Sequence, residues 1–283
     1  MDYRRIEERL MKVLMVASTA FILLTLILIV GAVAVKGFGA INWAMLTQTP
    51  KGGFYLGKEG GILNAILGSF YLVAAATLLA LLIGLPVVLY LNVYCRRGSR
   101  MAAMVRFSLD VLWGVPSIVF GAFGFLIMLS VGLRASLLGG ILTVALLMLP
   151  ILCRAMDEVM RMAPPDLLEA SYALGATRFQ TAVKVITRQC MAGILTAVLI
   201  AFGRGIGDAA SVMFTAGFSD SIPHSLTRPA ATLPLAIFFQ LGSPIPQVQE
   251  RAYASALVLT GIILAVSILS RALSRKLTRN SVL

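Results

Sequence analysis

Charged residues are scarce in this chain of 283 residues: Asp, Glu, Lys and Arg make up 13%, whereas hydrophobic residues make up 59%. Soluble domains contain about 25% charged residues, so the scarcity excludes an ordinary soluble domain and indicates a membrane protein. The charge that is present is mostly basic, with a net charge of +12. In a soluble protein this excess would suggest a nucleic-acid partner. Membrane topology explains it better here, and no nucleic acid is expected.

Histidine and cysteine are also rare, which bears on metal binding. His224 is the single histidine, and Cys95, Cys153 and Cys190 are the three cysteines. Their spacing matches no zinc pattern, and cysteines at membrane edges that face a reducing compartment are not expected to form disulfides. We therefore expect no metal site and interpret the cysteines as small apolar side chains.

Sequence signatures of catalysis are missing. No Gly-x-x-x-x-Gly-Lys-Ser/Thr motif occurs, so the chain lacks the phosphate-binding loop of an ATPase. No combination of nucleophile, base and orienting group is apparent either. The chain is therefore expected not to be an enzyme and to bind no cofactor. Any ATP and Mg²⁺ that drive it must be bound by another subunit.

Six runs with little or no charge reach the length of about 20 residues that a transmembrane helix requires. They cover residues 13–35, 60–95, 111–133, 135–153, 189–219 and 252–270. The sequence therefore predicts an all-α membrane protein with six transmembrane helices. The first run is longer than the apolar part of a signal peptide, so we expect it to be retained. The apolar piece 230–241 is too short to span a membrane and predicts an interfacial or re-entrant helix.

The positive charges indicate the orientation of the helices. With the N-terminus inside, most of the 24 lysines and arginines fall in cytoplasmic segments, which is the distribution that the positive-inside rule describes. Because the number of spans is even, both termini are predicted to be cytoplasmic. The charged segment at about 157–188 is then cytoplasmic as well.

This segment predicts two helices joined by a sharp turn. Pro164-Pro165 suits the start of a helix, because the missing N–H costs nothing in the first turn, and Gly175 can end that helix in a left-handed conformation. Thr177 and Gln180 have the spacing of a capping box, which predicts a second, longer helix running into the membrane. The geometry suits a rigid knob in a partner's groove; the alternative is a loop helix that packs on its own chain.

The fifth run contains the only ionisable pair predicted to lie within the membrane. Arg204 and Asp208 are four residues apart, so they share one face of a helix. Each costs about 2.5–3.5 kcal/mol at a bilayer centre, so both should face the bundle interior or a wet cavity. The guanidinium suits an oxyanion, and glycines at 203, 205 and 207 leave room for a ligand or a neighbouring helix. The alternative is a pair that satisfies itself and pins this helix in the bundle.

Two weaker candidates for the substrate pathway lie in other runs. Ser117 follows a proline in the third run, where a broken helix can present backbone groups to an ion; a simple packing kink is equally compatible with the sequence. Asn64 lies in a stretch where Gly61, Ala65 and Ser69 share one helix face. Such small residues allow close helix packing, and we favour packing over substrate contact for this face.

The charged segment resembles the coupling loop of permeases from ATP-binding-cassette (ABC) importers. That loop has the pattern Glu-Ala-Ala, three residues, Gly, nine residues, Ile-x-Leu-Pro. Glu169, Ala170 and Gly175 match its first half, with Ser171 in place of the second Ala. The second half departs from the pattern, with Thr187-Arg188 where Leu-Pro is expected. The resemblance implies that Glu169, Ala170, Ser171 and Gly175 contact an ATPase.

Further motifs resemble the phosphate-importer permeases, in particular their PstA branch. They are the stretches at 61–69, 115–121 and 193–208 together with Thr215-Ala216-Gly217. The resemblance covers the chain from about residue 60 to its C-terminus. Asp208-Ala209 departs from the family, in which Glu-Thr is common at this position.

The resemblance implies a type I ABC importer permease with a MetI-like fold in the bacterial inner membrane. Residues 1–59 would form a cytoplasmic segment, the first span and an external loop, residues 60–276 the permease core, and residues 277–283 a cytoplasmic tail. The expected partners are a homologous PstC-like permease, a PstB-like ATPase dimer, a periplasmic PstS-like phosphate-binding protein and membrane lipid. The alternatives are a permease for molybdate or sulfate, an ion-coupled secondary carrier, and a purely structural membrane subunit.

Overall fold

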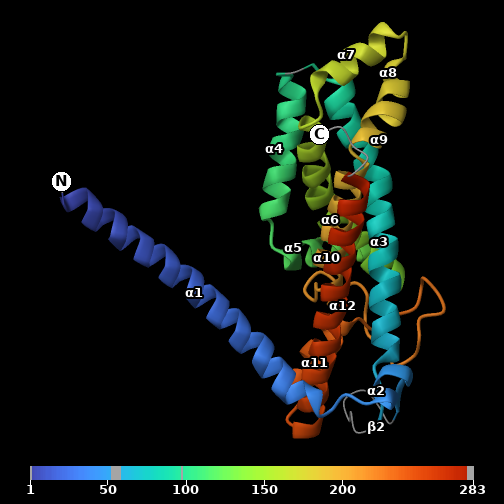
Figure 1. Ribbon diagram of the computed structural model, residues 1–283. Helices are drawn as coiled ribbons and strands as arrows, with labels where there is room; N and C mark the ends of the chain where they lie inside the picture. The colour runs from blue at the N-terminus through green and yellow to red at the C-terminus, as the bar shows by residue number, and fades with distance from the viewer. Residues whose placement is uncertain (1, 52–58, 97, 279–283) are drawn as a thin grey trace.

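The computed structural model describes residues 2–51, 59–96 and 98–278. It is an elongated bundle of helices with one short antiparallel pair of strands (Figure 1). Two segments, η1 and η2, are π-helical. The elements in chain order are α1 (Asp2–Phe38), α2 (Trp43–Thr47), β1 (Pro50–Lys51), β2 (Glu59–Gly60), α3 (Leu63–Leu89), η1 (Tyr90–Tyr94), α4 (Arg100–Gly114), α5 (Ser117–Ser130), α6 (Leu137–Arg161), α7 (Pro165–Ala173), α8 (Arg178–Gln180), η2 (Thr181–Ile186), α9 (Thr187–Gln189), α10 (Met191–Ile206), α11 (Leu233–Leu241) and α12 (Pro246–Thr278).

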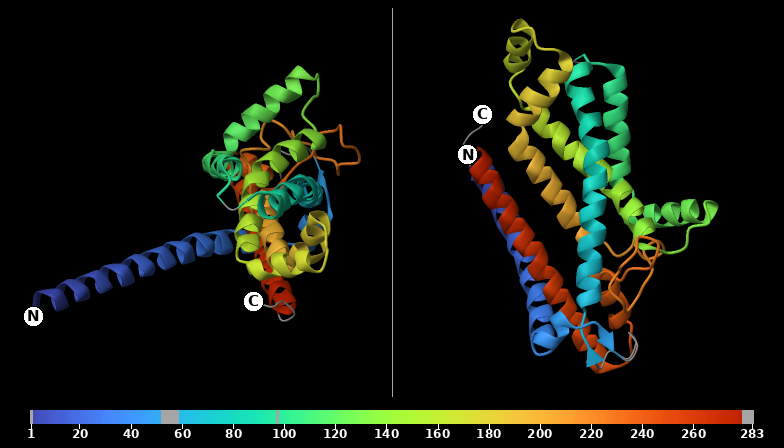
Figure 2. Two further views of the ribbon diagram at one scale, coloured as in Figure 1. Left: turned by 90° about the horizontal axis from the view of Figure 1, so that it is seen from above. Right: turned by 90° about the vertical axis from the view of Figure 1, so that its right-hand side faces the viewer.

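The two ends of the bundle carry different elements. We call the end formed around α7 and α8 the α7 end, and the opposite end, with α2 and α11, the α11 end (Figure 1). The N-terminus of α1 and the C-terminus of α12 both lie toward the α7 end (Figure 2, right). Residues 279–283 of the predicted C-terminal tail lie outside the described residues.

Four of the six predicted spans are single long helices. Among the described residues, α1, α3 with η1, α6 and α12 are each long and apolar enough to cross a membrane. The other two spans are bent pairs of helices, and the number of spans is six when each pair is counted as one. The all-α prediction is therefore confirmed, whereas two of the spans are not the uninterrupted helices that their apolar runs suggest.

The third predicted span, 111–133, is broken near its start. Helix α4 ends at Gly114, Val115 is extended, and α5 starts at Ser117 after a bend of 100°. The cause is Pro116, which disfavours a helical conformation at the residue before it and has no N–H to continue the helix. As a result α5 leaves the bundle at a steep angle, about midway along α3 (Figure 2, right).

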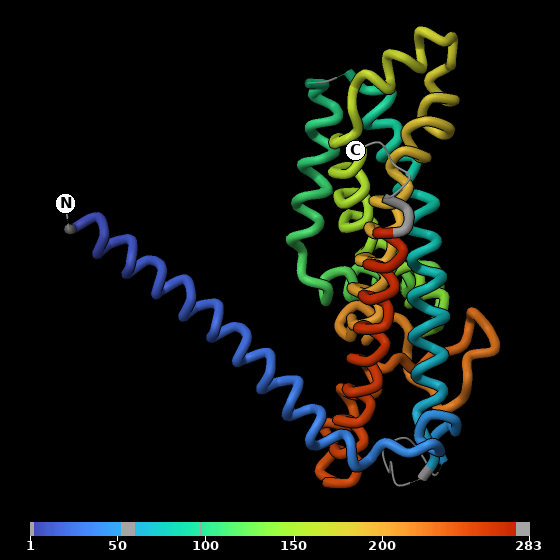
Figure 3. Tube along the Cα trace, in the orientation of Figure 1, coloured from blue at the N-terminus to red at the C-terminus, as the bar shows by residue number. Residues whose placement is uncertain are grey.

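The fifth predicted span is interrupted twice. The helix that follows the turn at Gly175 passes through the π-helical η2 and bends by 73° before α10, so the prediction of one continuous helix into the membrane is wrong. Helix α10 then ends at Ile206, and residues 210–216 form turns. The prediction that 189–219 is helical throughout is therefore also wrong. Figure 3 shows how the trace folds back after α10.

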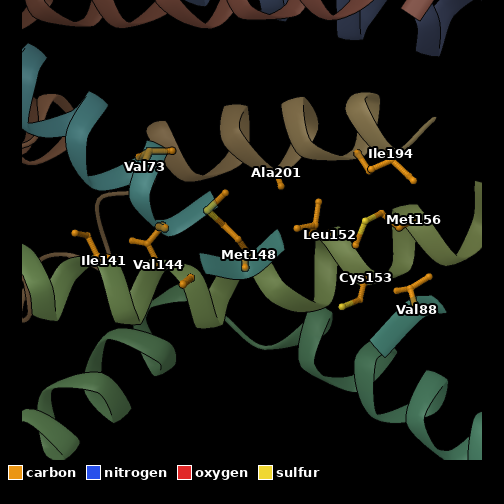
Figure 4. Close-up of a cluster of buried hydrophobic side chains, with 14 of the residues drawn as sticks. Val73, Val88, Ile141, Val144, Met148, Leu152, Cys153, Met156, Ile194 and Ala201 are labelled. Carbon is orange, nitrogen blue, oxygen red and sulfur yellow. The ribbon is translucent and has the colours of Figure 1, made fainter. Parts of the chain in front are cut away.

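The core of the bundle lies where α3, α6 and α10 meet. Met148, Leu152 and Met156 of α6 are fully buried there (Figure 4). Close approach of α10 depends on Gly205, because a Cβ at this position would lie 2.8 Å from the Met148 sulfur. Protein interiors are packed to crystal-like density, so a larger residue here would have to displace the buried Met148 side chain or move α10 away from α6.

The α11 end is closed by packing of α11 on α3 and α12. The backbone N–H of Leu233 donates to Ser69 Oγ at 2.7 Å, and Ala65 and Ser69 are buried. Ala65 and Ser69 thus form a packing face, as predicted, whereas Gly61 lies before the start of α3 and is not on that helix face. The short apolar piece 230–241 contains α11, which covers Leu233–Leu241, and the first turn of α11 is buried in the protein.

Candidate functional site

The Arg204–Asp208 pair forms at the end of α10. Arg204 Nη1 lies 2.9 Å from Asp208 Oδ1. The prediction that both residues lie on one helix is wrong, because α10 ends at Ile206 and Asp208 follows the cap residue Gly207. The ion pair nevertheless forms, because the chain turns back toward the helix immediately after Gly207.

The two members of the pair differ strongly in exposure. The Arg204 side chain is 46% exposed, whereas that of Asp208 is 4% exposed. Asp208 also accepts a hydrogen bond from the backbone N–H of Ser211 at 2.9 Å, so one carboxylate oxygen holds the guanidinium and the other holds the turn. In the described part of the chain, Asp208 is the only ion-pair partner of Arg204. A guanidinium has five N–H donors, so most of them are free to contact a ligand or a second subunit.

The three glycines around Arg204 have different roles. A Cβ on Gly203 would meet no atom within 4 Å, and one on Gly207 would make only ordinary contacts at 3.8 Å or more. Gly205, by contrast, packs against Met148 of α6. Open space therefore lies beside Arg204 at Gly203 and Gly207, whereas Gly205 allows α10 to pack against the core.

Ser117 begins α5, the helix that packs against the turn after Asp208. A Cβ on Gly121, one turn further along α5, would lie 2.8 Å from the carbonyl oxygen of Ala210. The broken third span thus abuts the Asp208 turn, although Ser117 itself is only partly buried. The same turn contains Ser211, whose buried hydroxyl has no hydrogen-bond partner among the described residues. Sequence reasoning missed Ser211, since nothing in its spacing separates it from a helical serine.

Asn64 lies at the start of α3, toward the α11 end. Its side chain is fully buried, and Nδ2 donates to the carbonyl oxygen of Ser219 at 2.8 Å. Its Oδ1 has no hydrogen-bond partner among the described residues. The amide therefore ties α3 to the segment that follows the Asp208 turn, and the structure records no contact between Asn64 and the Arg204–Asp208 pair.

The predicted helix–turn–helix is present and projects from the α7 end (Figure 1); we call residues 164–180 the knob. Gly175 has φ +82°, the left-handed conformation that ends α7. The Thr177–Gln180 capping box is complete, with hydrogen bonds of 3.0 and 3.2 Å. These local predictions are confirmed, because caps and left-handed glycines depend on neighbouring residues alone.

The residues that resemble the coupling motif divide into outer and inner positions. Glu169 and Ala170 are exposed on α7, and Leu174 beside them is 89% exposed. Ser171 instead points inward, where its hydroxyl lies 2.8 Å from Thr181 Oγ1 of η2. The knob therefore offers an apolar and acidic outer surface and is braced from within by a buried hydroxyl pair.

A buried ion-pair cluster near the α7 end was not predicted. Arg106 of α4 binds the fully buried carboxylate of Asp157 through Nε at 2.9 Å and Nη2 at 3.0 Å, and Asn92 donates to the same group at 2.8 Å. Arg154 pairs with Asp110 at 2.7 Å. The sequence offered one signal, because Asp157 lies four positions beyond the predicted end of the fourth span. In the structure, helix α6 continues past that end to Arg161, so Asp157 lies within the helix.

The fold places the chain in a known class. It resembles solved structures of the inward-facing MetNI methionine ABC transporter, with a TM-score of 0.60 and 19% sequence identity, over 76% of this chain and 95% of that chain. At this identity the likeness concerns the fold alone, and it confirms the MetI-like prediction. The protein thus has the fold of an ABC transporter permease.

A sequence-family model described as "Binding-protein-dependent transport system inner membrane component" matches residues 84–279, and the chain belongs to this family. Its relatives include the phosphate transport system permease protein PstA of Yersinia pestis, 34% identical over 97% of this chain and 92% of the relative. The PstA protein of Haemophilus influenzae is 34% identical over 95% of this chain and 94% of the relative. The chain is a multi-pass permease subunit of the bacterial inner membrane.

Proposed function

We propose that this chain is the transmembrane permease subunit of an ATP-driven phosphate importer and forms half of its translocation pathway. The observation that carries the proposal is the anchored, half-exposed guanidinium of Arg204. It occurs in a chain whose relatives, matched over nearly their whole length, are named as phosphate transport permeases. Those names favour phosphate over molybdate or sulfate, and the family favours an ABC importer over a secondary carrier.

The proposed substrate contact follows from the geometry of the Arg204–Asp208 pair. A phosphate oxygen can take up the free N–H donors of Arg204 in charge-assisted hydrogen bonds, while Asp208 keeps the guanidinium in place and moderates its attraction for the anion. Ser117 would border the pathway from α5. Asn64 would contribute from its buried position by fixing the segment that follows the Asp208 turn.

The proposed coupling surface is the knob at the α7 end, which we place in the cytoplasm. Glu169, Ala170 and Gly175 would contact a separate, PstB-like ATPase dimer that binds ATP and Mg²⁺, and Ser171 would brace α7 from within. A PstC-like permease would supply the other half of the pathway, and a PstS-like binding protein would deliver phosphate at the α11 end. Closure of the ATPases on ATP would move the two knobs together and open the pathway outward, and hydrolysis would let it relax and release phosphate inside.

The test is uptake of labelled phosphate by the complete complex in proteoliposomes. Removing charge-assisted hydrogen bonds costs about 1.5–3 kcal/mol, so Arg204→Ala should lower uptake by at least about tenfold while the complex still assembles. Arg134→Ala is the control, because Arg134 is an exposed arginine in the segment between α5 and α6. Normal uptake by Arg204→Ala would remove the proposed role of the pair. Inhibition by unlabelled phosphate, but not by equal molybdate or sulfate, identifies the substrate.

A further inference from the structure

A cavity of about 400 Å³ opens at the α7 end, away from the Arg204–Asp208 pair. It lies between η1, the start of α4, the end of α6, and α7 with η2. Three arginines, Arg96, Arg106 and Arg161, line it together with Asn92 and Cys95, and we call it the arginine cavity. Three arginines and one acidic partner, Asp157, leave an excess of positive charge at this cavity, which favours a bound anion.

The acidic groups near the arginine cavity do not neutralise it. Asp157 is fully buried and is bound by Arg106 and Asn92. In the described part of the chain, Arg96 and Arg161 form no ion pair, and the neighbouring Glu158 reaches only Arg154, at 3.9 Å. The carboxylate of Asp157 thus orients Arg106 and attracts Arg161 from a greater distance, whereas neither Arg161 nor Arg96 has an ion-pair partner of its own among the described residues.

We propose that the arginine cavity binds a phosphate group, either inorganic phosphate or the headgroup of an anionic phospholipid. Guanidiniums present forked N–H donors that match phosphate oxygens. Basic pockets between transmembrane helices at the cytoplasmic side suit phospholipid headgroups. The volume lies within the range of ligand pockets, about 300–1,000 Å³, and leaves room for a headgroup as well as for a hydrated free anion.

A ligand bound in the arginine cavity would also affect the knob. Leu168 of α7 and Ile186 of η2 line the same cavity as the three arginines. A bound phosphate group therefore joins the ends of three membrane-crossing segments to the element that we propose contacts the ATPase, so it would stiffen the knob. This consequence rests on the proposed function, whereas the binding itself does not.

Cys95 gives a reporter at the site itself, because it lines the cavity and is only partly buried, while Cys153 and Cys190 are buried. The experiment measures the rate at which a small maleimide labels Cys95 in the purified complex, with Cys153 and Cys190 replaced by Ala. Nanodiscs of phosphatidylcholine alone are compared with and without inorganic phosphate at matched ionic strength. Nanodiscs that also contain phosphatidylglycerol form the lipid arm.

Several-fold protection of Cys95 by inorganic phosphate identifies the free anion as the ligand, and protection in phosphatidylglycerol nanodiscs identifies the lipid. In the double variant Arg96→Gln/Arg161→Gln, at least about tenfold more ligand should be needed for the same protection, since hydrogen bonds to charged groups are lost. Arg100→Gln is the matched control, an exposed arginine at the start of α4 that does not line the cavity. Its protection should equal that of the parent protein.

Equal labelling in all nanodiscs, or protection that survives in the double variant, would overturn the proposal. If the complex shields Cys95 from the reagent altogether, hydrogen exchange of the amides in 91–106 decides instead. Exchange there should slow with phosphate or phosphatidylglycerol in the parent and not in the double variant. Phosphate uptake is not part of this readout, so failure here leaves the proposed role of Arg204 untouched, and the reverse also holds.

Discussion

Replacing Asp157 by Asn should destabilise the α7 end of the bundle more than any neutralising change nearby. The carboxylate is fully buried and holds Arg106 in a two-pronged ion pair at 2.9 and 3.0 Å, with Asn92 as a third partner at 2.8 Å. An amide in its place turns an N–H toward the guanidinium and leaves Arg106 without a counter-charge.

The magnitude follows from the burial of the two partners. Breaking a buried ion pair by removing one partner costs about 3–5 kcal/mol. The Arg106 side chain is 23% exposed, so water can compensate part of the loss, and we expect about 3 kcal/mol. At about 2–4 °C per kcal/mol for chains of 150–250 residues, the apparent melting temperature should fall by about 10 °C.

The assay is thermal melting of the purified complex, followed by intrinsic fluorescence, with Glu158→Gln as the matched control. Glu158 is the next residue on α6, its side chain is 69% exposed, and it reaches Arg154 only at 3.9 Å. Exposed ion pairs contribute about 0–1 kcal/mol, so the control should melt within about 4 °C of the parent. Equal melting temperatures for the two variants would refute the reasoning. Partial recovery in Arg106→Met/Asp157→Leu would support it, because well-packed apolar residues can replace a buried pair.

Two further predictions concern glycines. Gly205→Ala should lower the free energy of unfolding by about 1–3 kcal/mol through overpacking against Met148. Gly203→Ala places its methyl group in open space, so it should leave the melting temperature unchanged or slightly higher. Similar losses of stability in both variants would contradict the packing assignment. Gly175→Ala should lower the free energy of unfolding by about 1–2 kcal/mol, because an alanine is strained at a φ of +82°. A Cβ at this position would meet no atom within 4 Å, so steric clashes do not add to this backbone strain. Faster hydrogen exchange at 170–176 would confirm this local loosening of the knob, and unchanged exchange would argue against it.

Local features of the chain could be predicted well from the sequence. The capping box at Thr177 and the left-handed Gly175 are set by residues a few positions apart, and the structure has both. The four uninterrupted spans follow from apolar runs of sufficient length, because an unpaired backbone is too costly in lipid for anything but a helix or a closed barrel.

The sites required more than local rules. Arg204 and Asp208 were paired by helical spacing, yet the pair forms across a helix end, with the second carboxylate oxygen holding the N–H of Ser211. Helical spacing pairs Asp157 with Arg154, three residues earlier, and the structure has that contact only at 3.7 Å. The shorter ion pair of Asp157, at 2.9 Å, is with Arg106 from another helix. A sequence pattern does not show which side chain from a distant part of the chain donates hydrogen bonds to a buried carboxylate.

By itself, therefore, the sequence determined that this protein is helical, spans the membrane repeatedly and carries a knob with defined caps, since each of these depends on hydrophobicity or on contacts within one turn. Tertiary structure alone decided where α10 stops, which glycines face open space, which arginines form ion pairs, and which arginines line the cavity. These outcomes depend on how closely α3, α4, α6 and α10 approach one another, and that distance is set by side chains that meet only when the helices pack.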